Sequence, residues 1–167
     1  SDSSAVCLLG AGVEGGRVVA ASSGGQVGSV SAVVSYDAAG VSGCLATNVA
    51  PSGGMRVTVS GTGMGVAGYT AGARLAVTAC SSVEWVSDSG VVCVVGGGVG
   101  GSAGVSVSVG LQVGTSGMVA SYDVGSVSSA SGVNGPASGS VSVSVAGSGF
   151  GAGCDYSAAG RVGGSAF

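Results

Sequence analysis

Three stretches of this chain alternate valine with serine or threonine, and they set the expectation for the rest of it. The stretches are residues 56–60, 105–109 and 141–145. Side chains of a β-strand point to opposite faces in turn, so this period of two places the valines on one face and the hydroxyls on the other. Glycine-rich segments recur between the valine-rich ones, at a spacing typical of a β-sandwich. No helical periodicity with caps accompanies them, and the pattern predicts an all-β fold.

We expect two antiparallel sheets packed face to face between residues 38 and 123. The valines would face inward and the serines outward. Seven short strands are predicted, at Gly40–Gly43, Met55–Ser60, Ala73–Thr78, around Trp85, and at Val91–Val95, Val105–Val109 and Met118–Tyr122.

The pattern also repeats at a fixed offset, which has to be considered before any local signal. Val57–Gly65 returns 86 residues later as Val143–Gly151, and the match extends over most of the chain. After Gly151 one extra residue enters, and from Tyr156 onward the offset is 87. The repeat predicts three parts: residues 1–37 as the back half of a unit, 38–123 as a complete unit, and 124–167 as the front half of another. Since Ser1 falls inside a repeat, we expect a processed product or a piece of a longer array.

Composition excludes several classes of function. Only 7% of the residues are charged, the net charge is −3, and the four arginines are scattered, whereas a nucleic-acid surface needs clustered cations. No apolar run reaches the length of a membrane span. Histidine and lysine are absent, which removes two of the usual acid–base groups, and no serine has an evident base partner. We therefore expect no enzyme, no cofactor and no metal.

Cysteine usage favours an oxidising, extracellular or cell-surface location, because no C-x-x-C or Cys/His cluster indicates a metal site. Cys80 and Cys93 bracket twelve residues that include Trp85, and we predict a disulfide between them. A bridge of that loop length contributes about 3 kcal/mol. Cys44 and Cys154 have no counterparts in the other copy, and we hypothesise an inter-module bridge between them. Cys7 has no equivalent partner in the chain.

The motifs together resemble the IPT/TIG family of immunoglobulin-like modules. Those that carry the resemblance are Asn48 with Pro51–Gly54, the Val57–Gly65 strand and turn, the Cys80–Cys93 block with Trp85, and Ser35-Tyr36-Asp37 at the unit boundary. The chain is most similar to the tandem TIG arrays of secreted proteins in algae and other microbial eukaryotes. It departs from the pattern at Met64, where the family usually has Phe, and at Phe167, where the repeat predicts Cys.

Several residues have a functional and a structural interpretation. Trp85 would stack on a sugar if exposed, but an aromatic beside a disulfide is typical of a sandwich core. The glycine turns lack the following helix that a phosphate loop needs. Asp2, Asp37, Asp88 and Asp123 recur near the unit boundaries, where calcium between modules is one interpretation and Asx-turns are the favoured one.

The function favoured by these features is a structural extracellular fibre or cell-surface filament. Residues 1–37 of one copy would complete residues 124–167 of the next, lacking only the equivalents of Ser81–Val86, in a head-to-tail arrangement. The alternative is an adhesin or glycan-binding module that uses an exposed sandwich end. Neither Asn48 nor Asn134 lies in an N-glycosylation sequon, so any sugars are expected to be O-linked to outward Ser or Thr.

Overall fold

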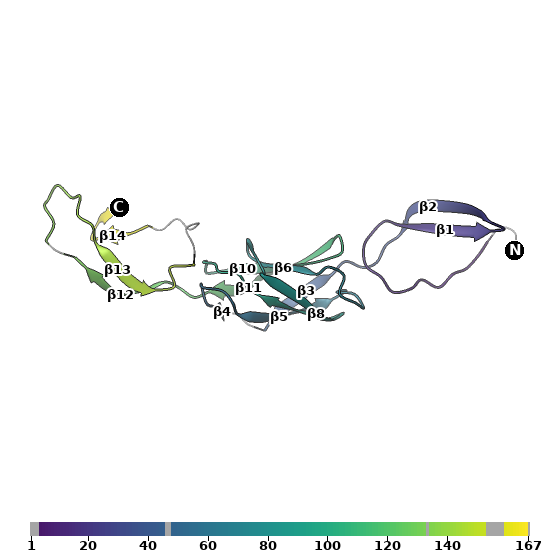
Figure 1. The fold of residues 1–167 in the computed structure, drawn as a ribbon, viewed down its shortest axis with the longest axis horizontal. Coiled ribbons are helices and arrows are strands. Elements are labelled where there is room, and N and C mark those ends of the chain that lie inside the picture. The colour runs from purple at the N-terminus through teal and green to yellow at the C-terminus, as the bar shows by residue number, and fades with distance from the viewer. Residues whose placement is uncertain (1–3, 46–47, 133, 153–158, 167) are drawn as a thin grey trace.

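The computed structural model describes residues 4–45, 48–132, 134–152 and 159–166. Those residues form strands, turns and loops and no helix. Three parts follow one another along an extended molecule (Figure 1). A two-stranded hairpin lies at the N-terminal end, a two-sheet sandwich in the middle, and two short strand pairs at the C-terminal end. The all-β, immunoglobulin-like prediction is confirmed.

The central sandwich consists of a four-stranded and a five-stranded sheet. The first has the order β3-β5-β9-β8, with β3 at Gly40–Cys44, β5 at Arg56–Thr62, β9 at Gly90–Val94 and β8 at Ser82–Ser87. The second has the order β4-β11-β10-β6-β7, with β4 at Asn48–Val49, β11 at Gln112–Tyr122, β10 at Ala103–Val109, β6 at Gly72–Leu75 and β7 at Thr78–Ala79. All pairings are antiparallel except that of β4 with β11.

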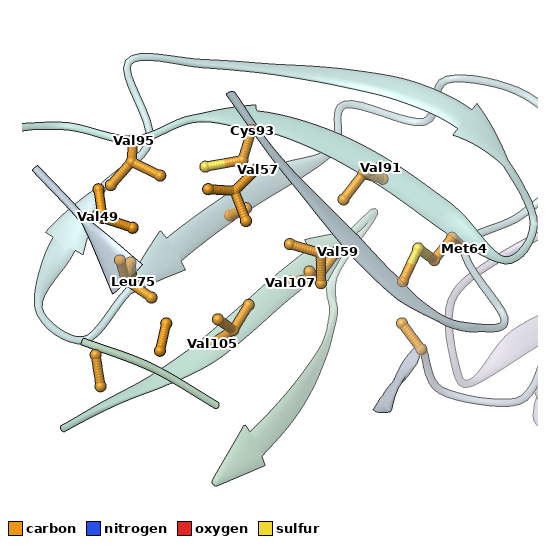
Figure 2. Packing of buried hydrophobic residues seen from close by; sticks show 14 of the residues in the cluster. Val49, Val57, Val59, Met64, Leu75, Val91, Cys93, Val95, Val105 and Val107 are labelled. Atoms are coloured by element: carbon orange, nitrogen blue, oxygen red, sulfur yellow. The ribbon is translucent and has the colours of Figure 1, made fainter. Parts of the chain in front are cut away.

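The core lies between these two sheets, as the alternation predicts. Along β10 the valines are buried and the serines between them are partly exposed. Figure 2 shows Val57 and Val59 of β5 packed close to Val105 and Val107 of β10. Burying these side chains is the main favourable term in the stability of such a small unit.

The terminal strands repeat pairings of the central sandwich. They are β1 at Arg17–Ser23 with β2 at Gln26–Val34, β12 at Ser126–Ser131 with β13 at Ser144–Ser148, and β14 at Arg161–Val162 with β15 at Ser165–Ala166. Val19 pairs with Val30 in β1–β2, as Val105 pairs with Ser116 86 residues later in β10–β11. The same equivalence relates β12–β13 to β3–β5 and β14–β15 to β6–β7. Even the irregularity between Val41 and Gly43 recurs between Val127 and Ser129.

The number of predicted strands is wrong: the described residues between 38 and 123 form nine strands, not seven. The stretch predicted as one strand at Ala73–Thr78 is divided between β6 and β7, because Ala76 takes a φ of 52° in a tight turn. β4 lies outside all seven predicted strands, and it forms because Asn48 and Val49 pair with the end of β11. β11 is also longer than predicted.

The strand expected at residues 141–145 is correct only in part, because β13 begins at Ser144. The equivalent strand β5 is held on its second edge by β9, with Val57 opposite Cys93. β13 pairs with β12 alone. A strand with a neighbour on only one edge has fewer backbone hydrogen bonds to hold it, and the paired stretch is correspondingly shorter.

Candidate interaction surfaces

The region around Trp85 is structural. A disulfide joins Cys80 to Cys93 with the Cα atoms 5.8 Å apart, as the sequence predicts. Trp85 is partly buried against the core, and its indole Nε1 donates a hydrogen bond to the carbonyl oxygen of Met64 at 3.0 Å. Because the indole N–H is hydrogen-bonded to the backbone and the ring is partly buried, the structure supports Trp85 as a core residue over a residue that stacks on a sugar.

The Gly61–Gly65 segment is a turn with its own hydrogen-bond partners. The amide of Gly65 donates to the Oδ1 of Asp88 at 2.9 Å, and the amide of Met64 donates to the carbonyl oxygen of the same residue. Gly63 and Gly65 both have positive φ, at 71° and 82°, which only glycine adopts without strain. The structure therefore agrees with a turn rather than an anion-binding loop.

Two of the aspartates near the unit boundaries, Asp88 and Asp123, accept hydrogen bonds from protein groups. Besides Asp88, Asp123 accepts a hydrogen bond from the side-chain amide of Asn48, which in turn accepts one from Ser121. Asp37 lines a cleft described below, and Asp2 lies outside the described residues. Within the described ranges, no three His, Cys, Asp or Glu residues come together as metal ligands would.

The other cysteines give no further bridge to describe. Cys44 is on β3 and packs partly buried against the core, whereas Cys154 lies outside the described residues. The bridge between them stays a prediction. Cys7 is exposed and has no disulfide in the described part of the chain.

A joint connects the N-terminal part to the central sandwich, and Val13 is its centre. Val13 is 5% exposed and belongs to the central core. β-Carbons placed on Gly65 and Gly110 would lie 3.0 and 3.2 Å from its methyl groups, so both glycines leave room for it. Strand β11 contributes Gln112, whose Nε2 donates to the carbonyl oxygen of Tyr36 at 3.0 Å. The segment before β1 therefore closes one end of the central core.

Tyr36 holds this joint together. Its hydroxyl donates to the carbonyl oxygen of Gly10 at 2.7 Å, and its amide donates to the carbonyl oxygen of Glu14 at 3.1 Å. A β-carbon on Gly12 would lie 2.6 Å from the ring, so the ring packs directly on that backbone. Glu14 has a φ of 92° and forms an ion pair with Arg17 at 2.7 Å.

The same arrangement recurs one repeat later, at the other end of the sandwich. The hydroxyl of Tyr122 donates to Gly96 at 3.2 Å, its amide donates to Gly100 at 2.9 Å, and its ring lies against Gly98. Gly100 also has a positive φ, like Glu14. The valine differs, because Val99 is 41% exposed where Val13 is buried, and Gly100 has no side chain to form the ion pair that Glu14 forms with Arg17.

Each joint borders a shallow cleft. The first, of about 350 Å³, is lined by residues that include Asp37, Gly63 and Asp88, and the second, of about 330 Å³, by residues that include Asp123, Gly149 and Phe150. The joints were not identified from the sequence beyond the Ser35-Tyr36-Asp37 boundary. The available signal was the recurrence of Gly10-x-Gly12-Val13 as Gly96-x-Gly98-Val99.

The third surface is an open apolar cleft of about 830 Å³ on the C-terminal part. It is bordered by β12, β13, β14 and the turn that holds Phe150, and its apolar lining is Val127, Ala130, Val143, Val145, Phe150, Ala159 and Val162. All of these side chains are exposed in this chain. A contiguous apolar surface of this kind marks an interaction site.

Comparison with known proteins identifies the central part. The family model of the IPT/TIG domain matches residues 41–122. No curated protein matches the chain. A solved structure described as the plexin A4 full extracellular region resembles it with a TM-score of 0.46 and 18% sequence identity, over 65% of this chain and 12% of that one. This chain thus spans a small fraction of the plexin's length.

No described helix is long and apolar enough to cross a membrane. Residues 41–122 thus match the IPT/TIG domain, and the part of the chain that contains them is folded as an immunoglobulin-like β-sandwich.

Proposed function

We propose that this chain is a structural extracellular repeat protein whose units stack head to tail in a fibre or cell-surface filament. In this proposal residues 38–123 are one complete TIG-like unit, and residues 1–37 and 124–167 are the back and front parts of neighbouring units. The chain acts as a mechanical element, without catalysis or a cofactor.

The observation that carries the proposal is the joint that occurs at both ends of the central sandwich. Tyr36 and Tyr122 make the same pair of hydrogen bonds, to glycine carbonyl oxygens at Gly10 and Gly96 and to the backbone at positions 14 and 100. These hydrogen bonds lie within residues 1–37 and within residues 38–123, so they support the two parts as equivalent units of one array. Across each boundary the cleft recurs with equivalent lining residues, Asp37 and Gly63 in the first and Asp123 and Gly149 in the second.

An extracellular location is supported by the Cys80–Cys93 disulfide. Low charge is consistent with a surface that packs against neighbouring chains or carries O-linked sugars. The complete absence of histidine and lysine, which removes two of the usual acid–base groups, favours a non-catalytic role.

The alternative is an adhesin or glycan-binding module, and Phe150 is the observation in its favour. Phe150 is an exposed aromatic at the edge of two clefts, as stacking on a sugar requires. However, Met64 at the equivalent position of the central unit is completely buried. The exposure of Phe150 is therefore explained equally well if this apolar face is buried by another chain on assembly.

Negative-stain electron microscopy of the purified chain over a range of concentrations tests the proposed function. We expect linear filaments of beads whose length increases with concentration. Isolated short rods at every concentration, combined with binding to a sugar that Phe150→Ala abolishes, would favour the adhesin instead.

A further inference from the structure

We propose that the open cleft on the C-terminal part binds residues 5–34 of a second copy, in the strand register that the central sandwich already uses. Residues 5–8 of that copy would form a strand beside β13, and its β1 would pair with β14. The inference rests on the proposed head-to-tail assembly and specifies the surface and register by which two copies meet.

The central sandwich provides the template for this contact. It contains the equivalents of the strands that would receive the second copy, together with the strands that pair with them and bury them. β9 lies beside β5 with Val57 opposite Cys93 and Val59 opposite Val91. β10 lies beside β6 with Val105 opposite Leu75. The recipient pairs β12–β13 and β14–β15 of the C-terminal part have the registers of β3–β5 and β6–β7. Among the described residues of the C-terminal part, no strands equivalent to β4, β8, β9, β10 and β11 lie beside them.

The N-terminal part carries matching donor segments. The hairpin β1–β2 has the register of β10–β11, and residues 4–8 are the sequence equivalents of β9, Gly90–Val94. Residues 5–8 belong to no strand of this structure, and Leu9, which follows them, is 61% exposed whereas its equivalent Val95 is 2% exposed. An extended apolar segment without a partner is well suited to strand addition at a sheet edge.

Transfer of the template register gives specific pairs between the two copies. In the first sheet, Val143 would lie opposite Cys7 and Val145 opposite Ala5. In the second sheet, Val162 would lie opposite Val19, and Arg161 opposite Ala20. Each pair is obtained from a pair of the central sandwich. The donor residue is numbered 86 lower than its central equivalent, and the recipient residue is numbered 86 higher in β13 and 87 higher in β14.

Burial in the template indicates what the association would gain. Val143 and Val162 are 38% and 58% exposed, whereas their equivalents Val57 and Leu75 are 3% and 2% exposed. Phe150 and Val145 show the same contrast with Met64 and Val59. Removing this apolar surface from water is favourable in proportion to its area, and it would also extend β13 over residues 141–143.

The donor has to come from another molecule. In Figure 1 the β1–β2 hairpin and the β14 strand lie at opposite ends of the extended chain, with the whole central sandwich between them. A chain that offers a donor at one end and a recipient at the other makes a heterologous contact, which propagates instead of closing.

The first test compares charge substitutions at two exposed valines. Val162→Asp places a carboxylate at the centre of the proposed contact, whereas Val77→Asp alters a valine in the β6–β7 turn of the central unit, away from it. We expect sedimentation analysis to show concentration-dependent association for the wild type and for Val77→Asp, and at least tenfold weaker association for Val162→Asp. Association of Val162→Asp like that of the wild type would overturn the proposal.

The second test reads the register directly. One chain carries Val19→Cys, the other Val162→Cys, and both carry Cys7→Ser. After mixing and mild oxidation we expect a covalent dimer on a non-reducing gel, with the new bridge located by mass spectrometry. The control replaces Val19→Cys with Ala20→Cys, which points to the opposite face of the strand and should form several-fold less dimer.

The outcomes separate this inference from the proposed function. Filaments without the Val19–Val162 bridge would leave the filament function standing and refute the register. If the Val19–Val162 bridge forms but the protein assembles only into discrete dimers, the proposed register is supported and the filament function is refuted. A wild-type chain that remains monomeric at every concentration would refute both.

Discussion

Val145 lies one repeat after Val59 at the same position of the same strand pairing, but Val145 is 45% exposed and Val59 1%. The two side chains therefore differ in what covers them and not in local structure. Over Val59 lies the second sheet of the central sandwich, as Figure 2 shows for its contacts with the β10 strand. The described residues of this chain supply no such sheet over Val145.

The joint valines provide a first prediction. Val13→Ala should destabilise the chain by about 1–2 kcal/mol, because two buried carbons are lost between Gly65 and Gly110. Val99→Ala at the equivalent position of the second joint is the matched control and should cost less than about 0.5 kcal/mol, since Val99 is exposed. Urea denaturation followed by the fluorescence of the single tryptophan, Trp85, measures both. Equal effects of the two substitutions would contradict the assigned role of Val13.

Gly65 provides a second prediction, because its backbone and its surroundings both demand glycine. It has a φ of 82°, and a β-carbon there would lie 2.7 Å from the ring of Tyr69. Gly65→Ala should therefore cost more than about 2 kcal/mol, from strain and overpacking together. Gly25→Ala, with a φ of 80° and open space around it, isolates the strain and should cost about 1 kcal/mol. The comparison uses urea denaturation, with circular dichroism for Gly25→Ala because Trp85 is remote from it. A Gly65→Ala protein as stable as the wild type would show that the turn is not packed as described.

The disulfide provides a third prediction. Replacing both Cys80 and Cys93 with serine should lower the unfolding free energy by about 3 kcal/mol, because the unfolded chain regains the entropy of an open loop. Differential scanning calorimetry of the wild type with and without reductant, beside the double variant, measures this. The double variant should itself be insensitive to reductant. A wild type whose melting temperature does not change on complete reduction would contradict the prediction.

Trp85 provides a fourth prediction. Trp85→Phe retains most of the packing but removes the hydrogen bond to the carbonyl oxygen of Met64, and should cost about 1 kcal/mol. Thermal unfolding by circular dichroism measures this cost. Trp85→Ala removes the ring as well and should cost several kcal/mol. Two variants that are equally stable would indicate that the ring does not pack on the core.

Much of the fold was predictable because local chemistry encodes it. The alternation in residues 105–109 predicts which side chains face inward, and the structure buries those valines. The positions of Cys80 and Cys93 around Trp85 predict a bridge, and the structure contains it, with Cys93 on β9 and Cys80 in the connection between β7 and β8. The 86-residue period relates one pairing register to another, and the registers recur at that offset.

The rest was decided by contacts between segments far apart in sequence. Val13 and Val99 both follow a Gly-x-Gly sequence, and the burial of Val13 depends on Gly65 and Gly110 of a different unit. β4 exists only because β11 reaches it, and residues 141–143 fall outside β13, which has a partner on one edge only. An alternating sequence determines which face of a strand is apolar. Whether that face is buried depends on the strands that tertiary structure places over it, since burial belongs to a pair of surfaces and not to one.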